Sequence, residues 1–210
     1  IYGGAMSQVM GEYSLMREDV LMIIMFNVVG VAMPFPFLFK MKFHFTNRQL
    51  LINAALVVAT CNFLIMYTDS VPLMCILAYI AGFFKLCGCF EIMSTIQLWM
   101  TPKRDFTIFF PLLYCFVLGN MSLSPWVTEH LIYVYQDWRI INWVMTGALL
   151  AVALFLYVTT HNFRFMKPIP FISLDYLGLI LWSAWMLEFI FFFNYGEHYN
   201  WLDSEVMRID

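Results

Sequence analysis

Five ionisable side chains lie inside long apolar runs of this sequence, where a charge finds few partners. They are Lys85, Glu91, Glu129, His130 and Glu188. A charge in the middle of an apolar layer costs at least about 2.5 kcal/mol, so each side chain needs an opposite charge, a wet cavity or a change of protonation. Lysine and carboxylate groups can form ion pairs, and a carboxyl or imidazole group can carry a proton. These residue types therefore predict charge pairing and proton transfer within apolar surroundings.

The apolar runs predict the elements that position these groups. The chain has 210 residues, of which 62% are hydrophobic and 12% charged, outside the usual range of soluble proteins. About 20 apolar residues span the roughly 30 Å hydrocarbon layer of a membrane. Runs of this kind predict an all-α membrane protein with six transmembrane helices. The expected helices are 20–41, 49–68, 71–99, 106–135, 139–161 and 174–194, with kinks or ends at Pro34, Pro36 and Pro111.

The linkers between these runs alternate in charge. The basic linkers hold Lys40, Lys42 and Arg48, then Lys103 and Arg104, then Arg164 and Lys167. The first and last stretches and the linkers with Asp69 and Asp137 are acidic. Because Lys and Arg collect on the cytoplasmic side of a membrane, both ends of the chain are expected outside.

The chain reads as an internal fragment of a longer protein. It begins with Ile1 and lacks the basic and apolar pattern of a signal peptide. We expect an external segment at 1–19 after a missing first helix, five helices of one bundle at 20–161, and a cytoplasmic linker at 162–173. A further transmembrane helix at 174–194 and an external segment at 195–210 complete the expected organisation.

Lys85 and Glu129 are the two side chains expected to meet in the bundle. Lys85 falls near the middle of its helix, too deep to reach either membrane surface easily. Counted from opposite ends at about 1.5 Å per residue, Glu129 lies a few ångströms to the outer side of Lys85, within its reach. Such an ion pair would either take part in the activity or only fix how two helices dock, and the sequence leaves both open.

Glu91 and His130 are candidates for carrying protons. Glu91 stands six positions after Lys85, which turns it to another side of the same helix and disfavours direct pairing. It is expected in the cytoplasmic half of the membrane. His130 adjoins Glu129 and serves either the same role or a structural hydrogen bond.

Polar and small residues within the runs are expected to hold helices together. Asparagine, serine and threonine in such positions usually bond across to another helix, and glycine lets helices approach closely. They are Asn27, Asn53, Asn62, Asn120, Ser122, Ser124, Thr146, Gly82, Gly88, Gly119 and Gly147. The five cysteines have no companions at metal-ligand spacing, so no metal and no cofactor is expected.

Three linker motifs share their order and spacing with one known family. They are Asp137, Trp138 and Arg139 before the fifth helix, Pro102 with Arg104 before the fourth, and Asp175 with Gly178 at the last. Lys42 and Arg48 stand at matching positions in the loop after the first helix. Over nearly its whole length the chain resembles the major facilitator superfamily, in its fourteen-helix branch of drug:proton antiporters. The resemblance implies the second through seventh helices of that fold.

The resemblance also implies a function. It is secondary active transport in a bacterial inner membrane, exporting small amphipathic or toxic compounds in exchange for protons. The expected partners are the lipid bilayer, protons, a small-molecule substrate and the missing remainder of the chain, and no basic patch points to nucleic acid. An uptake permease for a metabolite and a non-transport polytopic membrane protein remain as alternatives. A membrane enzyme would need clustered catalytic or metal-binding residues, which the sequence lacks, so no enzymatic activity is expected.

Overall fold

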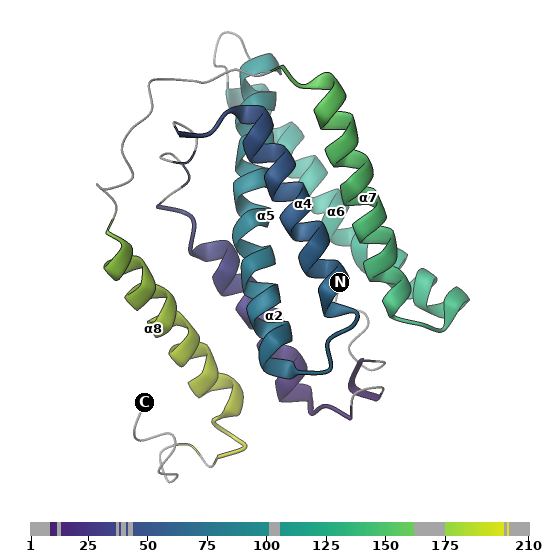
Figure 1. The fold of residues 1–210 in the computed structure, drawn as a ribbon, viewed down its shortest axis with the longest axis vertical. Coiled ribbons are helices and arrows are strands. Elements are labelled where there is room, and N and C mark those ends of the chain that lie inside the picture. The colour runs from purple at the N-terminus through teal and green to yellow at the C-terminus, as the bar shows by residue number, and fades with distance from the viewer. Residues whose placement is uncertain are drawn as a thin grey trace.

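The computed structural model describes residues 9–11, 14–36, 38, 41, 44–100, 106–161, 175–199 and 201, and the elements within this part are helices. Figure 1 shows their arrangement. The helices are α2 (Arg17–Ala32), α4 (Asn47–Ile65), α5 (Val71–Met100), α6 (Phe106–Tyr135), α7 (Arg139–Thr159) and α8 (Tyr176–Tyr195). The predicted all-α class is confirmed for the described residues.

Five of these helices are long and apolar enough to cross a membrane. They are α4, α5, α6, α7 and α8. Helix α2 has 16 residues, which at 1.5 Å per residue is about 24 Å and less than the hydrocarbon thickness. Five of the six predicted spans are therefore matched by helices of spanning length, and α2 by itself is shorter.

The predicted bounds of the first span, 20–41, are wrong. Helix α2 begins at Arg17 and ends at Ala32, and Met33 to Pro36 form a turn. Pro34 and Pro36 have no N–H to donate to the carbonyls four residues before them, so the helical hydrogen bonding is interrupted there. It resumes where the Leu38 amide donates to the Pro34 carbonyl at 3.0 Å. Pro111 is not an end point, because α6 continues through it and through Pro125.

The other helices begin and end within a few residues of the predicted positions, and side-chain caps explain two of the starts. The Thr46 hydroxyl accepts a hydrogen bond from the Gln49 amide at 3.3 Å, and the Gln49 side chain accepts one from the Thr46 amide at 3.4 Å. This reciprocal pair satisfies amides at the start of α4. The Asp175 carboxylate accepts from the Gly178 amide at 2.8 Å and caps α8 in the same way.

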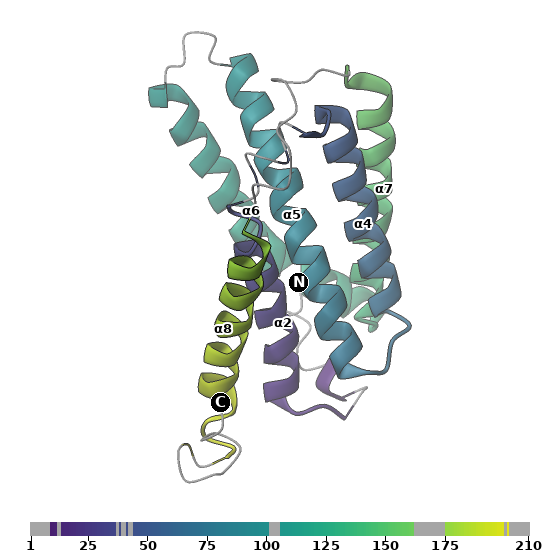
Figure 2. The same cartoon turned by 60° about the vertical axis from the view of Figure 1, so that its left-hand side comes forward.

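Helix α5 lies at the centre of the bundle. It packs against α2 and α4, and α4 packs in turn against α7. Helix α8 packs against α2, and α6 makes its main contact with α7. In Figure 2, α6 leans away from α5 over the half of α6 that lies near its start. The core of the described structure is therefore the set α2, α4, α5 and α7.

Helices that follow each other in sequence run in opposite directions. At one end of the bundle, Val20 near the start of α2 packs with Trp138 and Ile141 at the start of α7 and with Ile132 near the end of α6. At the same end, the starts of α2 and α5 meet the end of α8 through Ile23, Met74 and Ile190. Helix α4 starts at the opposite end of the bundle (Figure 1), and Arg48 is the second residue of that helix.

Helix α8 is attached to the bundle by polar contacts as well as apolar ones. The Tyr195 hydroxyl donates to the Asp19 carboxylate at 2.8 Å, and the Asn194 side chain donates to the Glu18 carbonyl at 3.0 Å. One further bond, 2.7 Å long, joins the hydroxyls of Tyr79 on α5 and Ser183 on α8. These bonds fix α8 against α2 and α5 at two levels along its length.

Helices α2 and α5 cross at two glycines, where their backbones touch. A Cβ atom on Gly30 would overlap the Tyr79 carbonyl, and one on Gly82 would overlap the Asn27 carbonyl. Beside this crossing, the Asn27 side-chain amide donates to the Ala78 carbonyl at 2.7 Å. Small residues with an interhelical hydrogen bond are the usual means of helix association in lipid, where no hydrophobic force drives it.

We expect Gly30→Ala and Gly82→Ala each to lower the free energy of unfolding by about 1–3 kcal/mol, because the added methyl must push the two backbones apart. Gly119→Ala and Gly147→Ala are matched controls, since a Cβ at either position meets no atom within 4 Å. Thermal unfolding of the four variants in lipid nanodiscs measures the difference. Equal stability of the Gly30 and control variants would contradict the crossing described above.

Candidate functional site

The candidate site is built on α5, whose sides face different neighbours. Ala78 and Gly82 face α2, as the crossing shows. Gly88 faces α4, since a Cβ there would lie 3.2 Å from the Ala54 side chain. Cys87 is buried and its thiol contacts the Met41 sulfur at 3.7 Å. Helix α5 thus presents different side chains to α2, to α4 and to Met41.

Lys85 stands in the middle of α5, between the side facing α2 and a cavity. Its ammonium donates a long hydrogen bond of 3.5 Å to Asn27 Oδ1. The same Asn27 holds the Ala78 carbonyl with its amide nitrogen, so its oxygen is oriented toward Lys85. The position of the ammonium therefore depends on the crossing of α2 and α5.

The predicted ion pair between Lys85 and Glu129 is wrong. Lys85 bonds to Asn27, and within the described part of the chain no carboxylate lies within ion-pair distance of its ammonium. Glu129 is exposed on α6, as are most of the residues of that helix. The prediction assumed that α6 packs closely against α5, whereas α6 makes its main contact with α7.

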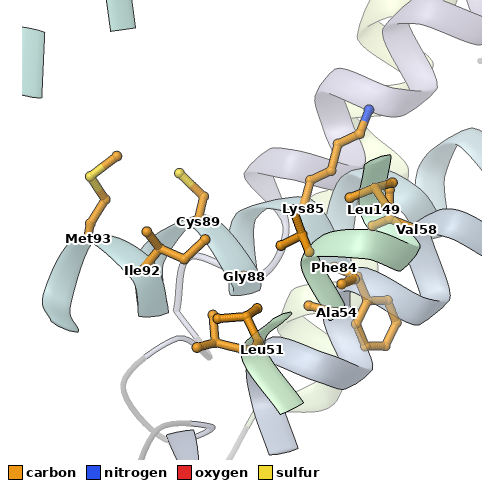
Figure 3. Close-up of a pocket in the computed structure, with 13 residues that line it drawn as sticks. Leu51, Ala54, Val58, Phe84, Lys85, Gly88, Cys89, Ile92, Met93 and Leu149 are labelled. Carbon is orange, nitrogen blue, oxygen red and sulfur yellow. The ribbon is translucent and has the colours of Figure 1, made fainter. Parts of the chain in front are cut away.

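A cavity of about 310 Å³ lies between α4, α5 and α7. Its wall is formed by Leu51, Ala54, Ala55, Val58, Phe84, Lys85, Gly88, Cys89, Ile92, Met93, Leu149, Val152 and Leu156. Lys85 is the one charged side chain among these lining residues. Figure 3 shows its stem beside the cavity and its ammonium extending away from Leu51 and Ile92. The volume falls at the small end of the range typical of ligand pockets.

A second cavity, of about 500 Å³, lies between α5 and α6. It is lined by Met93, Thr95, Ile96, Phe109, Leu112, Leu113 and Phe116. None of these lining side chains carries a charge, so this cavity offers apolar contact and little else. The cavity beside Lys85 is therefore the stronger candidate for recognising a ligand.

Glu91 is buried within α5, with 1% of its surface exposed. It lies one helical turn after Cys87, on the same side of α5, and does not line the cavity beside Lys85. The backbone carbonyl of Glu91 accepts hydrogen bonds from the Ser94 and Thr95 hydroxyls at 3.1 and 2.8 Å. A carboxyl this deeply buried in a spanning helix is a candidate for reversible protonation.

His130 and Glu188 have exposed positions. The His130 ring stacks on Trp126 of the same helix, with centroids 5.8 Å apart and planes 10° from parallel. Glu188 is exposed on α8. Neither lines either of the two cavities. The structure therefore brings Lys85 to a cavity and buries Glu91, but it does not gather the predicted ionisable residues into one cluster.

Arg48 joins the start of α4 to the end of α7. Its Nη2 atom donates to the Tyr157 carbonyl at 2.6 Å, and its guanidinium lies 4.2 Å from the centre of the Tyr157 ring. Tyr157 is in the last turn of α7, where backbone carbonyls have no partner within the helix. A cation there complements the negative end of the helix dipole. Arg48 thus holds α4 and α7 together at this end of the bundle.

The other basic-linker residues of the predicted motifs, Lys42, Pro102 and Arg104, lie outside the described residues.

The remaining motif residues shape the starts of two helices. The Asp137 carboxylate accepts a hydrogen bond from the Arg139 backbone amide at 2.8 Å. Trp138 is buried against Val20 and Ile141, where the starts of α2 and α7 meet. Asp175 caps α8 through Gly178, where a Cβ would collide with the Asp175 carboxylate. In this structure these residues stabilise the starts of α7 and α8.

Sequence reasoning missed the partners that position the site. Asn27 and Gly82 were expected to hold helices together, and they do, but Gly30 was not singled out and the bond between Asn27 and Lys85 was not foreseen. Asn120 was also expected to bond across helices, yet it donates to the Phe116 carbonyl of its own helix. Within the described part of the chain, no group of three or more potential ligands is placed to hold a metal ion.

We expect Arg48→Ala to lower the free energy of unfolding by about 1 kcal/mol, because it removes a charge-assisted bond to the end of α7. Arg48→Lys should recover part of this loss, since lysine keeps the charge but cannot stack its head group flat on a ring. Thermal unfolding in nanodiscs provides the measurement. An alanine variant as stable as the parent would show that the contact with Tyr157 contributes nothing.

Comparison with known proteins gives no family for the chain, because it matches no protein-family model, no curated protein and no solved structure.

Proposed function

We propose that this chain is part of a secondary active transporter that exports small amphipathic compounds in exchange for protons. The observation that carries the proposal is Glu91, a carboxyl with 1% of its surface exposed inside the spanning helix α5. Other residues of α5 line a cavity. Proton-coupled transport needs a protonatable group at membrane depth and a nearby binding space, and α5 carries both. The linker motifs that resemble drug:proton antiporters of the major facilitator superfamily support the same function.

The proposed fold has six spans, with α2 and the residues after it forming the first of them. The proposed orientation puts the start of α4 in the cytoplasm of a bacterial cell and the start of α2 outside its inner membrane. Charge placement in the sequence supports this orientation. The segments that join α2 to α4, α5 to α6 and α7 to α8, together with the first turn of α4, hold most of the basic residues, which are Lys40, Lys42, Arg48, Lys103, Arg104, Arg164 and Lys167. The starts of α2 and α7 at the other end hold Arg17 and Arg139. Positive residues favour the cytoplasmic side.

Separation of the two charged groups on α5 supports a division of roles. Lys85 borders the cavity, whereas Glu91 lies on another side of the helix. A proton taken up at Glu91 would change the charge inside the bundle without occupying the cavity. Substrate and proton would then be bound at different places and coupled through movement of α5.

We expect Glu91→Gln to reduce transport driven by a pH gradient at least tenfold, because glutamine has a similar shape but cannot exchange a proton. The measurement is efflux of a fluorescent amphipathic dye from proteoliposomes that hold the full-length protein. Glu188→Gln is the matched control, since that carboxyl is exposed on α8 and should leave the flux unchanged.

The same assay gives the direction of transport. Dye leaving the compartment that corresponds to the cytoplasm, with protons entering, supports export. Undiminished flux for Glu91→Gln would exclude Glu91 as the coupling group, and flux in the uptake direction would favour a permease.

A further inference from the structure

We propose that the cavity between α4, α5 and α7 binds an organic anion with an apolar body, whose acidic group lies at the Lys85 ammonium. This inference rests on the proposed transport function and names the class of substrate that the cavity would accept.

The lining selects an apolar body. Leu51, Val58, Ile92, Leu149 and Leu156 contribute aliphatic carbon from three different helices. Phe84 and Met93 add an aromatic ring and a flexible thioether. A ligand bound here gains by removing its own apolar surface from water.

Lys85 selects the charge of the ligand. A lysine ammonium has three N–H donors, and its bond to Asn27 is 3.5 Å long, at the weak limit for a hydrogen bond. Asn27 is a neutral amide, so it orients the ammonium without cancelling its charge. No carboxylate among the described residues pairs with Lys85. The positive charge is therefore available to an anion.

The geometry places the two selecting features side by side. The carbon stem of Lys85 forms part of the cavity wall, and its ammonium extends beyond the apolar lining, away from Leu51 and Ile92 and toward Asn27 of α2 (Figure 3). An anion with its tail among the aliphatic side chains would reach the ammonium with a head group that extends out of the cavity along the lysine stem. A cationic amphiphile would meet a like charge, and a neutral one would leave the lysine charge uncompensated.

Binding of decanoate to the full-length protein in nanodiscs of zwitterionic lipid tests the proposal. Decanol and decylamine have the same tail with a neutral or positive head group, and empty nanodiscs correct for partition into lipid. We expect decanoate to bind at least tenfold more tightly than either. Lys85→Met should weaken decanoate binding at least tenfold, and Lys85→Arg should keep it within a few-fold, because arginine retains the charge.

A second variant tests the place of binding without touching the charge. Leu149→Trp adds bulk to the α7 side of the cavity and should also reduce decanoate binding. Thermal unfolding of each variant shows whether it is folded. Equal binding of decanoate to the parent and to a folded Lys85→Met variant would overturn the proposal, as would tighter binding of decylamine.

A lipid could supply the same chemistry as a free amphiphile. Nanodiscs that contain the anionic lipid phosphatidylglycerol distinguish the two. Loss of Lys85-dependent decanoate binding in these nanodiscs identifies the occupant as an anionic lipid, and unchanged binding identifies a free amphiphile.

Failure of this inference is separable from failure of the transport function. Proton-driven dye flux without decanoate binding would overturn the ligand class alone, whereas Lys85-dependent binding without flux would overturn transport and support the site.

Discussion

The close crossing of α2 and α5 is the constraint on which the rest of the structure depends. Gly30 and Gly82 let the two backbones touch, and this contact brings the Asn27 amide to the Ala78 carbonyl. Once its nitrogen is held there, its oxygen faces Lys85. The position of the one charge beside the cavity thus follows from a backbone contact between two helices.

Lipid surroundings explain why so few contacts determine the arrangement. Helices in a membrane are not driven together by water, so specific packing and hydrogen bonds decide which surfaces meet. Arg48 fixes α4 to α7 at one end of the bundle, and Tyr195 fixes α8 to α2 near the other. The cavity lies within the part of the bundle that these contacts hold together, between α4, α5 and α7.

The two charged side chains in the middle of α5 lie on different sides of the helix. Lys85 is oriented by a neutral amide, which preserves its positive charge beside an apolar cavity. Glu91 is turned to another side of the helix and buried. Had Lys85 met Glu129, the two charges would have cancelled and the pair would have served mainly to dock two helices. The observed arrangement instead places Lys85 beside the cavity and Glu91 inside the bundle.

The sequence by itself determined the helical class and the approximate bounds of five of the six helices, because the length of an apolar run is a local property. The bonds of Thr46 and Asp175 to residues three positions away, which set two of the helix starts, are seen in the structure. The sequence also identified Lys85 and Glu91 as costly charges. Only the tertiary structure decided their partners. Whether Lys85 meets Asn27 or Glu129 depends on which helix crosses α5 closely, and the sequence pattern of helices that are apolar all round does not show which side faces which neighbour. That choice came from backbone contact at Gly30 and Gly82, between segments about 50 residues apart.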